Sequence, residues 1–177
     1  AYNDEDLICE SSQIFDQNKV NVFFNLKVGE RGKLVSLLKE LKSKGFDKIS
    51  LELSKNPFKA RKAISSYAFL TDCLVTSAWK FATEIQFPSH NPTEAEKLSI
   101  ISVGGYGRCE MAPFSDVDLL FLTPYKMTPW SENVIETVLH LLWDLKLKVG
   151  HSSRSIKDCL RLGINAYTIS TAMLEHR

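Results

Sequence analysis

The pattern of apolar and polar residues predicts helices for much of the first half of the chain. Residues 1–19 are mainly polar and are expected to be loosely structured, while the weak alternation in residues 20–28 predicts a strand. A helix is expected next, with Gly45 at its C-terminal end, and residues 48–54 fit either a strand or a helix. The apolar residues with helical spacing are Leu34, Leu37, Leu38 and Leu41.

A long helix with one apolar face is expected to follow. Asn56 is a suitable N-cap, and Pro57 suits the first helical position. The helix should run to about Gln86. The loop 87–94 then contains two prolines and is the expected boundary between a helical N-terminal part and the part that carries the chemistry. The apolar face consists of Ile64, Ala68, Leu74, Val75, Ala78, Phe81, Ala82 and Ile85.

The second half of the chain mixes strands and helices. Three short apolar stretches predict strands, at residues 97–103, 117–122 and 147–153. A helix is expected from Pro129 with Thr128 before it, and two short helices from Ser155 and Asn165. The helix from Pro129 has a buried side made of Trp130, Val134, Val138, Leu141, Leu142 and Leu145.

Composition narrows the class of protein without identifying it. The 177 residues suit one domain, or a small domain with a helical extension, and 44% apolar with 24% charged residues is typical of soluble globular proteins. The formal net charge of +1 gives no overall attraction to nucleic acid or to an anionic membrane, so an anionic partner needs a local site. No apolar stretch approaches the roughly 20 residues that span a bilayer.

The ends and the cysteines suggest a cytoplasmic fragment. The first residues are acidic and polar, unlike a signal peptide. The four cysteines are far apart and form no Cys-x-x-Cys pair, which argues against zinc and fits a reducing cytoplasm. The sequence stops within a helical pattern, so we expect a piece of a longer protein.

Two aspartates at the start of the second predicted strand are the first chemical signal. Asp116 and Asp118 lie two residues apart, so in a strand they share one face with Cα atoms roughly 6.5–7 Å apart. Neighbouring carboxylates repel each other, and burial makes each costlier, so a compensating cation is expected. Mg²⁺ prefers oxygen ligands and typically takes one or two carboxylates together with substrate phosphates.

A glycine-rich turn ten residues earlier is the second signal. Gly104, Gly105 and Gly107 have no Cβ, so backbone N–H groups can approach a phosphate chain closely. A short helix over residues 106–110 would add its N-terminal dipole, and Arg108 could donate charge-assisted hydrogen bonds to phosphate. The glycine-rich turn and the two aspartates together predict a site for a metal ion and a triphosphate.

Each signal alone is weak, whereas their combination is specific. A Gly-Gly pair is most often only a turn, and an Asp-x-Asp pair is most often a surface or capping feature. No Gly-Lys-Ser/Thr follows the glycines, so this is not a Walker A loop, and the Rossmann Gly-x-Gly-x-x-Gly is absent. An EF-hand is excluded because the flanks are strands and no glutamate closes a 12-residue loop.

The order of strand, Gly-Gly, spacer and Asp-x-Asp resembles the DNA polymerase β-type nucleotidyltransferase superfamily. The run GGYGRCEMAPFSDVDLLFL is similar to one of its families, the bacterial uridylyltransferase/uridylyl-removing enzyme of the nitrogen-regulatory PII protein. There the run typically reads Gly-Gly-Tyr-Gly-Arg-Gly-Glu-Leu-x-Pro-x-Ser-Asp-Ile-Asp-Leu. The similarity continues in LLWDLKLKVGHSSRSIKDCLRLG and TISTAMLEHR, and covers about residues 57–177.

The resemblance implies a fold and a reaction. The fold is α+β, with a small mixed sheet, flanking helices and a helical N-terminal extension; residues 1–55 form the extension and residues 56–177 the nucleotidyltransferase domain. The reaction is Mg²⁺-dependent transfer of UMP from UTP to a tyrosine of PII with release of pyrophosphate. The partners are UTP and PII, and neither nucleic acid nor membrane is expected.

The resemblance also assigns residues to the site. Asp116 and Asp118 match the catalytic pair that binds metal. His151 lies in the third predicted strand and is a further candidate for contact with the nucleotide. Arg154, which follows that strand, is another, with a surface ion pair as the alternative. The positions expected to contact phosphate, bind the nucleotide or order the loop are Gly104, Gly105, Arg108 and Ser115.

Several positions depart from the family pattern. Cys109 replaces a usual glycine, which would strain a turn with positive φ by roughly 1 kcal/mol or more. Residues 147–153 contain no third carboxylate, and residues 166–167 are Ala-Tyr where family members often have an aspartate nearby. Asp144 and Asp158 lie in helical segments and are expected to be solvated charges. No His-Asp pair occurs, so UMP removal and glutamine sensing are not expected of this chain.

Two other functions stay open at this stage. An enzyme of the same fold could transfer an adenylyl group to another protein or to a small molecule. Alternatively, the chain could be a nucleotide- or partner-binding module without catalysis, because no third carboxylate is evident. Comparing the binding of UTP with that of ATP distinguishes adenylyl transfer from uridylyl transfer. A module without catalysis would bind UTP but release no pyrophosphate in the presence of PII.

Overall fold

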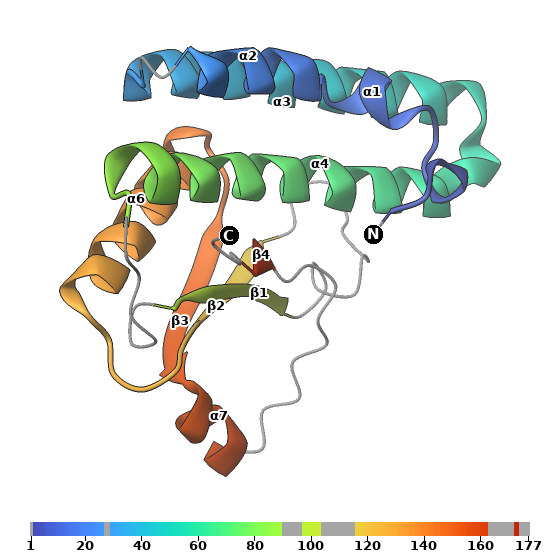
Figure 1. The fold of residues 1–177 in the computed structure, drawn as a ribbon. Helices are drawn as coiled ribbons and strands as arrows, with labels where there is room; N and C mark the ends of the chain where they lie inside the picture. Colours follow the sequence, from blue (N-terminus) through green and yellow to red (C-terminus); the bar gives the residue numbers. More distant parts are fainter. Residues whose placement is uncertain (1, 27–28, 90–96, 104–115, 163–171, 174–177) are drawn as a thin grey trace.

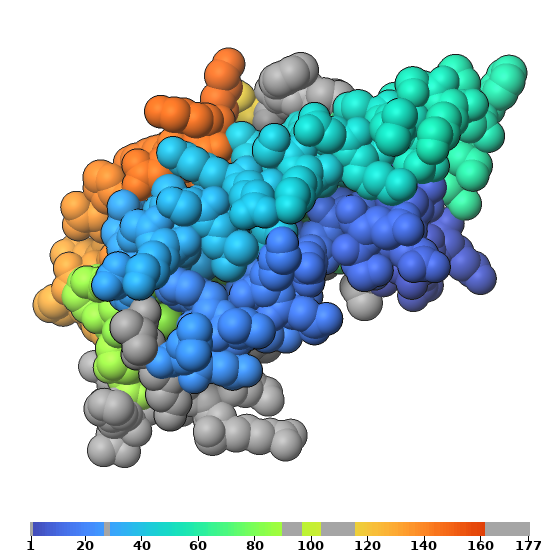
Figure 2. Space-filling view, turned by 90° about the horizontal axis from the view of Figure 1, so that it is seen from above, coloured from blue at the N-terminus to red at the C-terminus, as the bar shows by residue number. Residues whose placement is uncertain are grey.

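The computed structural model describes residues 2–26, 29–89, 97–103, 116–162 and 172–173. Its elements form successive layers (Figure 1): helices α2 and α3 lie outermost, α4 lies beneath them, and a sheet lies on the far side of α4. Figure 2 shows the outer side from above, covered by the N-terminal helices. The three helices span Gln17–Asn25 (α2), Arg31–Lys55 (α3) and Ala60–Lys80 (α4).

The N-terminal residues pack against the core, so the prediction of a loose segment at 1–19 is wrong. A 3₁₀ turn, η1 (Asp4–Asp6), and one helical turn, α1 (Ser11–Ile14), lie here. The backbone N–H of Ile8 donates to Ser66 Oγ on α4 at 2.9 Å. Two apolar pairs are buried and anchor the segment, although they are too short to produce a recognisable period: Leu7 with Ile8, and Ile14 with Phe15.

Most of the stretch 20–28, predicted as a strand, is helix α2. The Asp16 side chain caps this helix by accepting two backbone N–H groups of its first turn. Val20 and Phe24 lie four residues apart and are both buried, whereas Val22 between them is 58% exposed. The apparent alternation therefore came from an exposed apolar side chain, and burial follows the helical period.

Helix α3 continues through Gly45 to Lys55, so the predicted C-terminal end is wrong and residues 48–54 are helical. Gly45 is buried where α3 meets α1 and α4. A Cβ at this position would lie 2.6 Å from the carbonyl oxygen of Ile14 and 2.8 Å from Leu70 Cδ2. The glycine thus allows neighbouring segments to approach closely and does not end the helix.

The long helix predicted from Asn56 is confirmed, and it ends at Gln86 as expected. Asn56 Oδ1 accepts from the backbone N–H of Phe58 at 3.2 Å. The first turn is a 3₁₀ turn, η2 (Pro57–Lys59), which leads into α4, and the last turns form a π-helix, η3 (Phe81–Gln86).

A mixed sheet of four strands has the order β3-β2-β1-β4. Strand β1 is antiparallel to both β2 and β4, and β3 is parallel to β2. The three strands predicted in the second half of the chain are present, β4 was not predicted, and the α+β class with a small mixed sheet and flanking helices is confirmed. The strands are β1 (Ser99–Val103), β2 (Val117–Thr123), β3 (Val149–Ser155) and β4 (Ala172–Met173).

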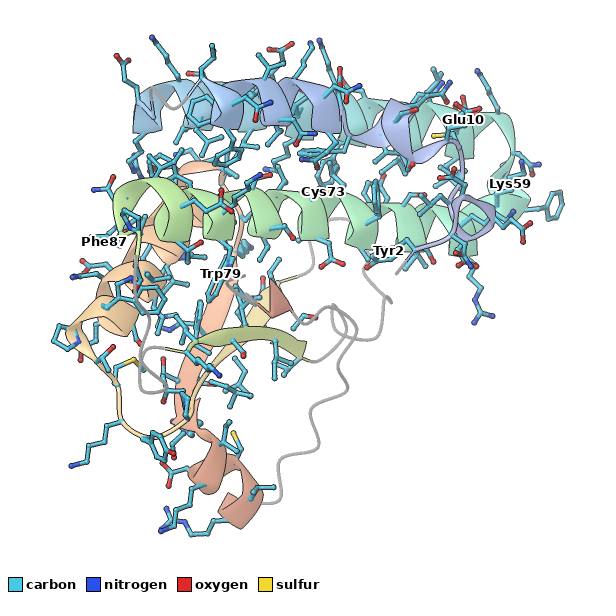
Figure 3. All side chains as sticks on the ribbon, viewed as in Figure 1. Tyr2, Glu10, Lys59, Cys73, Trp79 and Phe87 are labelled. Atoms are coloured by element: carbon cyan, nitrogen blue, oxygen red, sulfur yellow. The ribbon has the colours of Figure 1, made fainter. Side chains whose placement is uncertain are left out.

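One face of the sheet packs against α4 and α6 (Pro129–Asp144), and we call it the helix-covered face. Thr128 Oγ1 caps α6 by accepting from the backbone N–H of Ser131 at 3.1 Å, as predicted. Trp79, 2% exposed, lies on the side of α4 toward the sheet (Figure 3). The residues of β2 that share a core cluster with both helices are Val117, Leu119 and Phe121.

A short helix, α7 (Ile156–Leu162), follows β3. The Ser155 hydroxyl accepts from the backbone N–H of Asp158 at 3.1 Å, which confirms the predicted start. The helix predicted from Asn165 begins outside the described residues, but residues 172–173 form strand β4, so the prediction that this helix finishes the chain is wrong. Within the parts of the chain that the structure describes, no helix is both long and apolar enough to cross a membrane.

Candidate active site

Three strand ends meet at one end of the sheet, where Asp118 lies. Val103 is the last residue of β1, and it pairs with Asp118 of β2. On the other side of β2, Asp118 pairs with Gly150 near the start of β3. Since Gly104 and Gly105 follow Val103 directly in the sequence, the chain enters the glycine motif beside Asp118.

Asp116 and Asp118 are both exposed at this end, and Val117 between them is fully buried. This alternation agrees with the prediction that the two carboxylates lie on one side of the strand and the valine on the other. The Val117 N–H donates to the Lys148 carbonyl at 2.8 Å, which ties the start of β2 to the start of β3.

The four other predicted site residues lie outside the described residues, within 104–115. They are Gly104, Gly105, Arg108 and Ser115. Their roles therefore stay predictions, as does the strain expected at Cys109.

The face opposite the helices carries Asp118, and we call it the Asp118 face. Residues that pair directly across strands share a face, so Val103 and Gly150 flank Asp118 there. The Asp118 carboxylate lies over Gly150: a Cβ at residue 150 would be 2.5 Å from Asp118 Oδ1. Gly150 was not among the predicted site residues, although a lone glycine in a strand often marks a close approach.

The chemistry of the two aspartates suits Mg²⁺ without a third protein carboxylate. Among the described residues, no group of three or more His, Cys, Asp or Glu side chains is placed to hold a metal. The β3 residues on the Asp118 face are Gly150, Ser152 and Arg154, and none is acidic. Mg²⁺ is commonly bound by one or two carboxylates together with waters and phosphate oxygens. Asp116 and Asp118 therefore suit the ligands that the protein would contribute.

His151 lies on the helix-covered face, away from Asp118. It pairs with the buried Leu119. Its ring centroid is 6.3 Å from that of Trp143 on α6. It lines an open groove of about 390 Å³ between β3 and α6, so the structure does not bring it to the predicted nucleotide site.

Arg154 lies on the Asp118 face but near the other end of the strands. It pairs with Leu122, four residues beyond the pair of Asp118 and Gly150. At about 3.3 Å per residue this separates the Cα atoms by roughly 13 Å along the strand. Its guanidinium donates to the Ser153 carbonyl at 3.0 Å.

Asp144 is a half-exposed charge, as expected, but it also forms an ion pair that was not predicted. It accepts a hydrogen bond from Arg31 at the start of α3, so the pair links two elements. This hydrogen bond is the main reason that the pKa of Asp144 is lowered. The Asp158 carboxylate lies 3.6 Å from the Arg161 guanidinium within α7 and is half-exposed, which agrees with the expected solvated charge.

The described cysteines are free thiols that pack partly into the protein. Burial raises the pKa of Cys73 to about 12, with the negative charge of Asp72 adding to it. Burial also raises the pKa of Cys9. A raised pKa leaves little thiolate at neutral pH, so these two residues are structural thiols, as expected.

The fold and the site indicate the class of protein. The chain is an α+β protein whose two aspartates open a strand next to a glycine motif, which is the arrangement of a small nucleotidyltransferase-type fold.

Curated relatives give a more particular answer. The chain is 54% identical over 147 residues, 83% of its length, to the bifunctional uridylyltransferase/uridylyl-removing enzyme of Ruegeria pomeroyi. It is 57% identical over 143 residues (81%) to the enzyme of that name from Cereibacter sphaeroides, and 44% over 150 residues (84%) to that from Caulobacter vibrioides. The chain is therefore homologous to one segment of these enzymes, which confirms the family resemblance.

The extent of the match adds two facts. The chain spans only 15–16% of the length of these relatives. The matched stretches are longer than residues 56–177, so the similarity includes part of the N-terminal extension that the sequence resemblance had not covered. No protein-family model and no solved structure matches the chain.

Proposed function

We propose that this chain contains the nucleotidyltransferase site of a uridylyltransferase that moves UMP from UTP to a tyrosine of PII, in the cytoplasm. The observation that carries the proposal is the strand register: Asp118 pairs with Val103, the residue from which the chain enters the glycine motif. Homology to enzymes named uridylyltransferases supports the choice of nucleotide.

Asp116 and Asp118 are the residues that would hold Mg²⁺. When bound, the ion supplies charge neutralisation for the triphosphate. The backbone of Gly104 and Gly105 is proposed to bind phosphate oxygens, with Arg108 adding charge-assisted hydrogen bonds. The work of the protein is then to position the phosphates and to hold charges where the reaction needs them.

The transfer is balanced as an in-line displacement. The tyrosine oxygen forms a bond to the α-phosphorus of UTP, and the bond from that phosphorus to the oxygen bridging to the β-phosphate breaks. The phenolic proton passes to solvent, and pyrophosphate leaves. No residue of this chain forms a covalent bond to the substrate, so positioning of the reactants supplies most of the catalysis.

A paired substitution tests the proposal. Asp116→Asn and Asp118→Asn together remove both negative charges and keep the side-chain shape. With labelled UTP, Mg²⁺ and PII, we expect label on PII to fall to background while the circular dichroism spectrum is unchanged. The control, Glu132→Gln with Glu136→Gln, removes two exposed charges on α6 and should transfer normally. Normal transfer by the aspartate variant would refute the assignment.

The same assay separates the alternatives. Label from ATP but not from UTP would favour adenylyl transfer. Binding of UTP without release of pyrophosphate in the presence of PII would favour a module that binds nucleotides without catalysis.

A further inference from the structure

The environment of Gly150 differs from that of a glycine that serves packing. A Cβ built on Gly150 would lie 2.5 Å from Asp118 Oδ1 and 3.7 Å from Asp118 Cγ, and apart from residues 149–151 no other described atom comes within 4 Å. By contrast, a Cβ on Gly45 would meet the Ile14 carbonyl oxygen and the Leu70 side chain. Gly150 therefore makes room for one group, the carboxylate of Asp118.

We propose that Gly150 is a positioning residue for Asp118. Its missing side chain lets the carboxylate lie against β3, and this orientation is the one used to hold metal and nucleotide. The inference rests on the proposed function, because it assigns a role to the surroundings of a proposed catalytic group. It also explains a glycine inside a strand, where glycine is disfavoured by its backbone freedom and lack of packing.

A larger residue at position 150 would clash with the Asp118 carboxylate, which is free to move. Asp118 is exposed, so its carboxylate can rotate away from a new methyl group without disturbing the core. An ordinary contact needs about 3.4 Å or more, so the oxygen would move by roughly 1 Å. A displacement of that size at a reacting centre can lower a rate by about 10²-fold. The expected defect is thus in function and not in folding.

The test compares Gly150→Ala with Gly32→Ala. Gly32 lies in α3, and a Cβ there meets nothing within 4 Å, so it is a matched control. Three quantities are measured on the purified protein: transfer of UMP to PII, Mn²⁺ binding in the presence of UTP by electron paramagnetic resonance, and the thermal midpoint. We expect Gly150→Ala to reduce transfer about 10- to 100-fold and to weaken Mn²⁺ binding at least tenfold, with the midpoint unchanged or raised.

A double-mutant cycle removes the remaining ambiguity. In an Asp118→Asn background, adding Gly150→Ala should weaken Mn²⁺ binding no further, because the group that it displaces is already altered. Parental Mn²⁺ binding by Gly150→Ala, or equal losses in both backgrounds, would overturn the inference. If the parent protein transfers no UMP, the proposed function fails, and the Mn²⁺ comparison still decides whether Gly150 positions Asp118.

Discussion

At the scale of single residues, the glycines illustrate how the surroundings decide a role. Gly45 is buried against a backbone oxygen and a leucine, Gly32 has open space around it, and Gly150 faces one carboxylate. A backbone oxygen cannot move away from an added methyl group as easily as an exposed side chain can. The same substitution should therefore have opposite effects on stability at the first two positions, both of which lie in α3.

We expect Gly45→Ala to lower the free energy of unfolding by about 1–3 kcal/mol, because the added methyl overpacks the contact with Ile14 and Leu70. Gly32→Ala should raise it by up to about 1 kcal/mol, because alanine loses less backbone entropy in a helix. Urea denaturation followed by circular dichroism measures both. A Gly45→Ala protein as stable as the parent would show that the contact can relax.

At the scale of elements, two polar contacts join the start and middle of α3 to the end of α6. Arg31 donates to Asp144, and Lys42 Nζ donates to the Leu145 carbonyl at 2.7 Å. The second contact satisfies a carbonyl at the C-terminal end of α6, where the helix leaves such groups without internal partners. Burial lowers the pKa of Lys42, consistent with its position between the two helices.

The pair of Arg31 and Asp144 should make stability depend on pH. Because the pKa of Asp144 is lowered in the folded protein, its contribution is present above the ordinary value of 3.8 and is lost as pH falls through the lowered value. Both side chains are nearly half-exposed, so the coupling should be only a few tenths of a kcal/mol. A double-mutant cycle with Arg31→Met and Asp144→Asn measures it at pH 7 and pH 2.5. Equal coupling at both values would contradict the assignment.

At the scale of the whole molecule, one hydrophobic cluster continues from the N-terminal helices to the sheet. Its members include Leu38 and Ile49 of α3, Leu74 of α4, and Val117 and Phe121 of β2. The division into an extension, 1–55, and a domain, 56–177, remains a prediction about organisation. The shared core indicates that the extension contributes to the stability of the rest.

Removing residues 1–55 should therefore destabilise the remaining chain. The cut exposes the side of α4 that α3 covers, including Tyr67, which lies 3.1 Å from Ser50 Oγ through its hydroxyl. We expect residues 56–177 alone to lose a cooperative thermal transition and to bind the dye ANS. The control is Val22→Ser, which changes a side chain of the extension that is 58% exposed and should melt normally. A cooperative transition at the parental midpoint in the shorter chain would show an independent domain.

Local signals predicted the parts of the fold that depend on neighbours in sequence. The caps at Asn56 and Thr128 were recognisable because side chain and backbone partner lie within three residues. The failures at residues 1–19 and at Gly45 share a cause: the partners are distant in sequence, with Ser66 bonded to Ile8 and Leu70 beside Gly45. The ion pair of Asp144 was missed for the same reason, because Arg31 is far from it along the chain.

The amino-acid sequence alone determined strands β1 to β3 and the helices that follow Asn56 and Thr128, and it singled out Asp116 and Asp118 as candidates, because residue type and short spacing carry those signals. Only the tertiary structure decided that Asp118 lies between Val103 and Gly150, and that His151 faces the helices instead. Strand pairing joins residues that are far apart in sequence, and a shift of one residue would turn every side chain to the other face. The geometry of the candidate site is therefore a property of the assembled sheet.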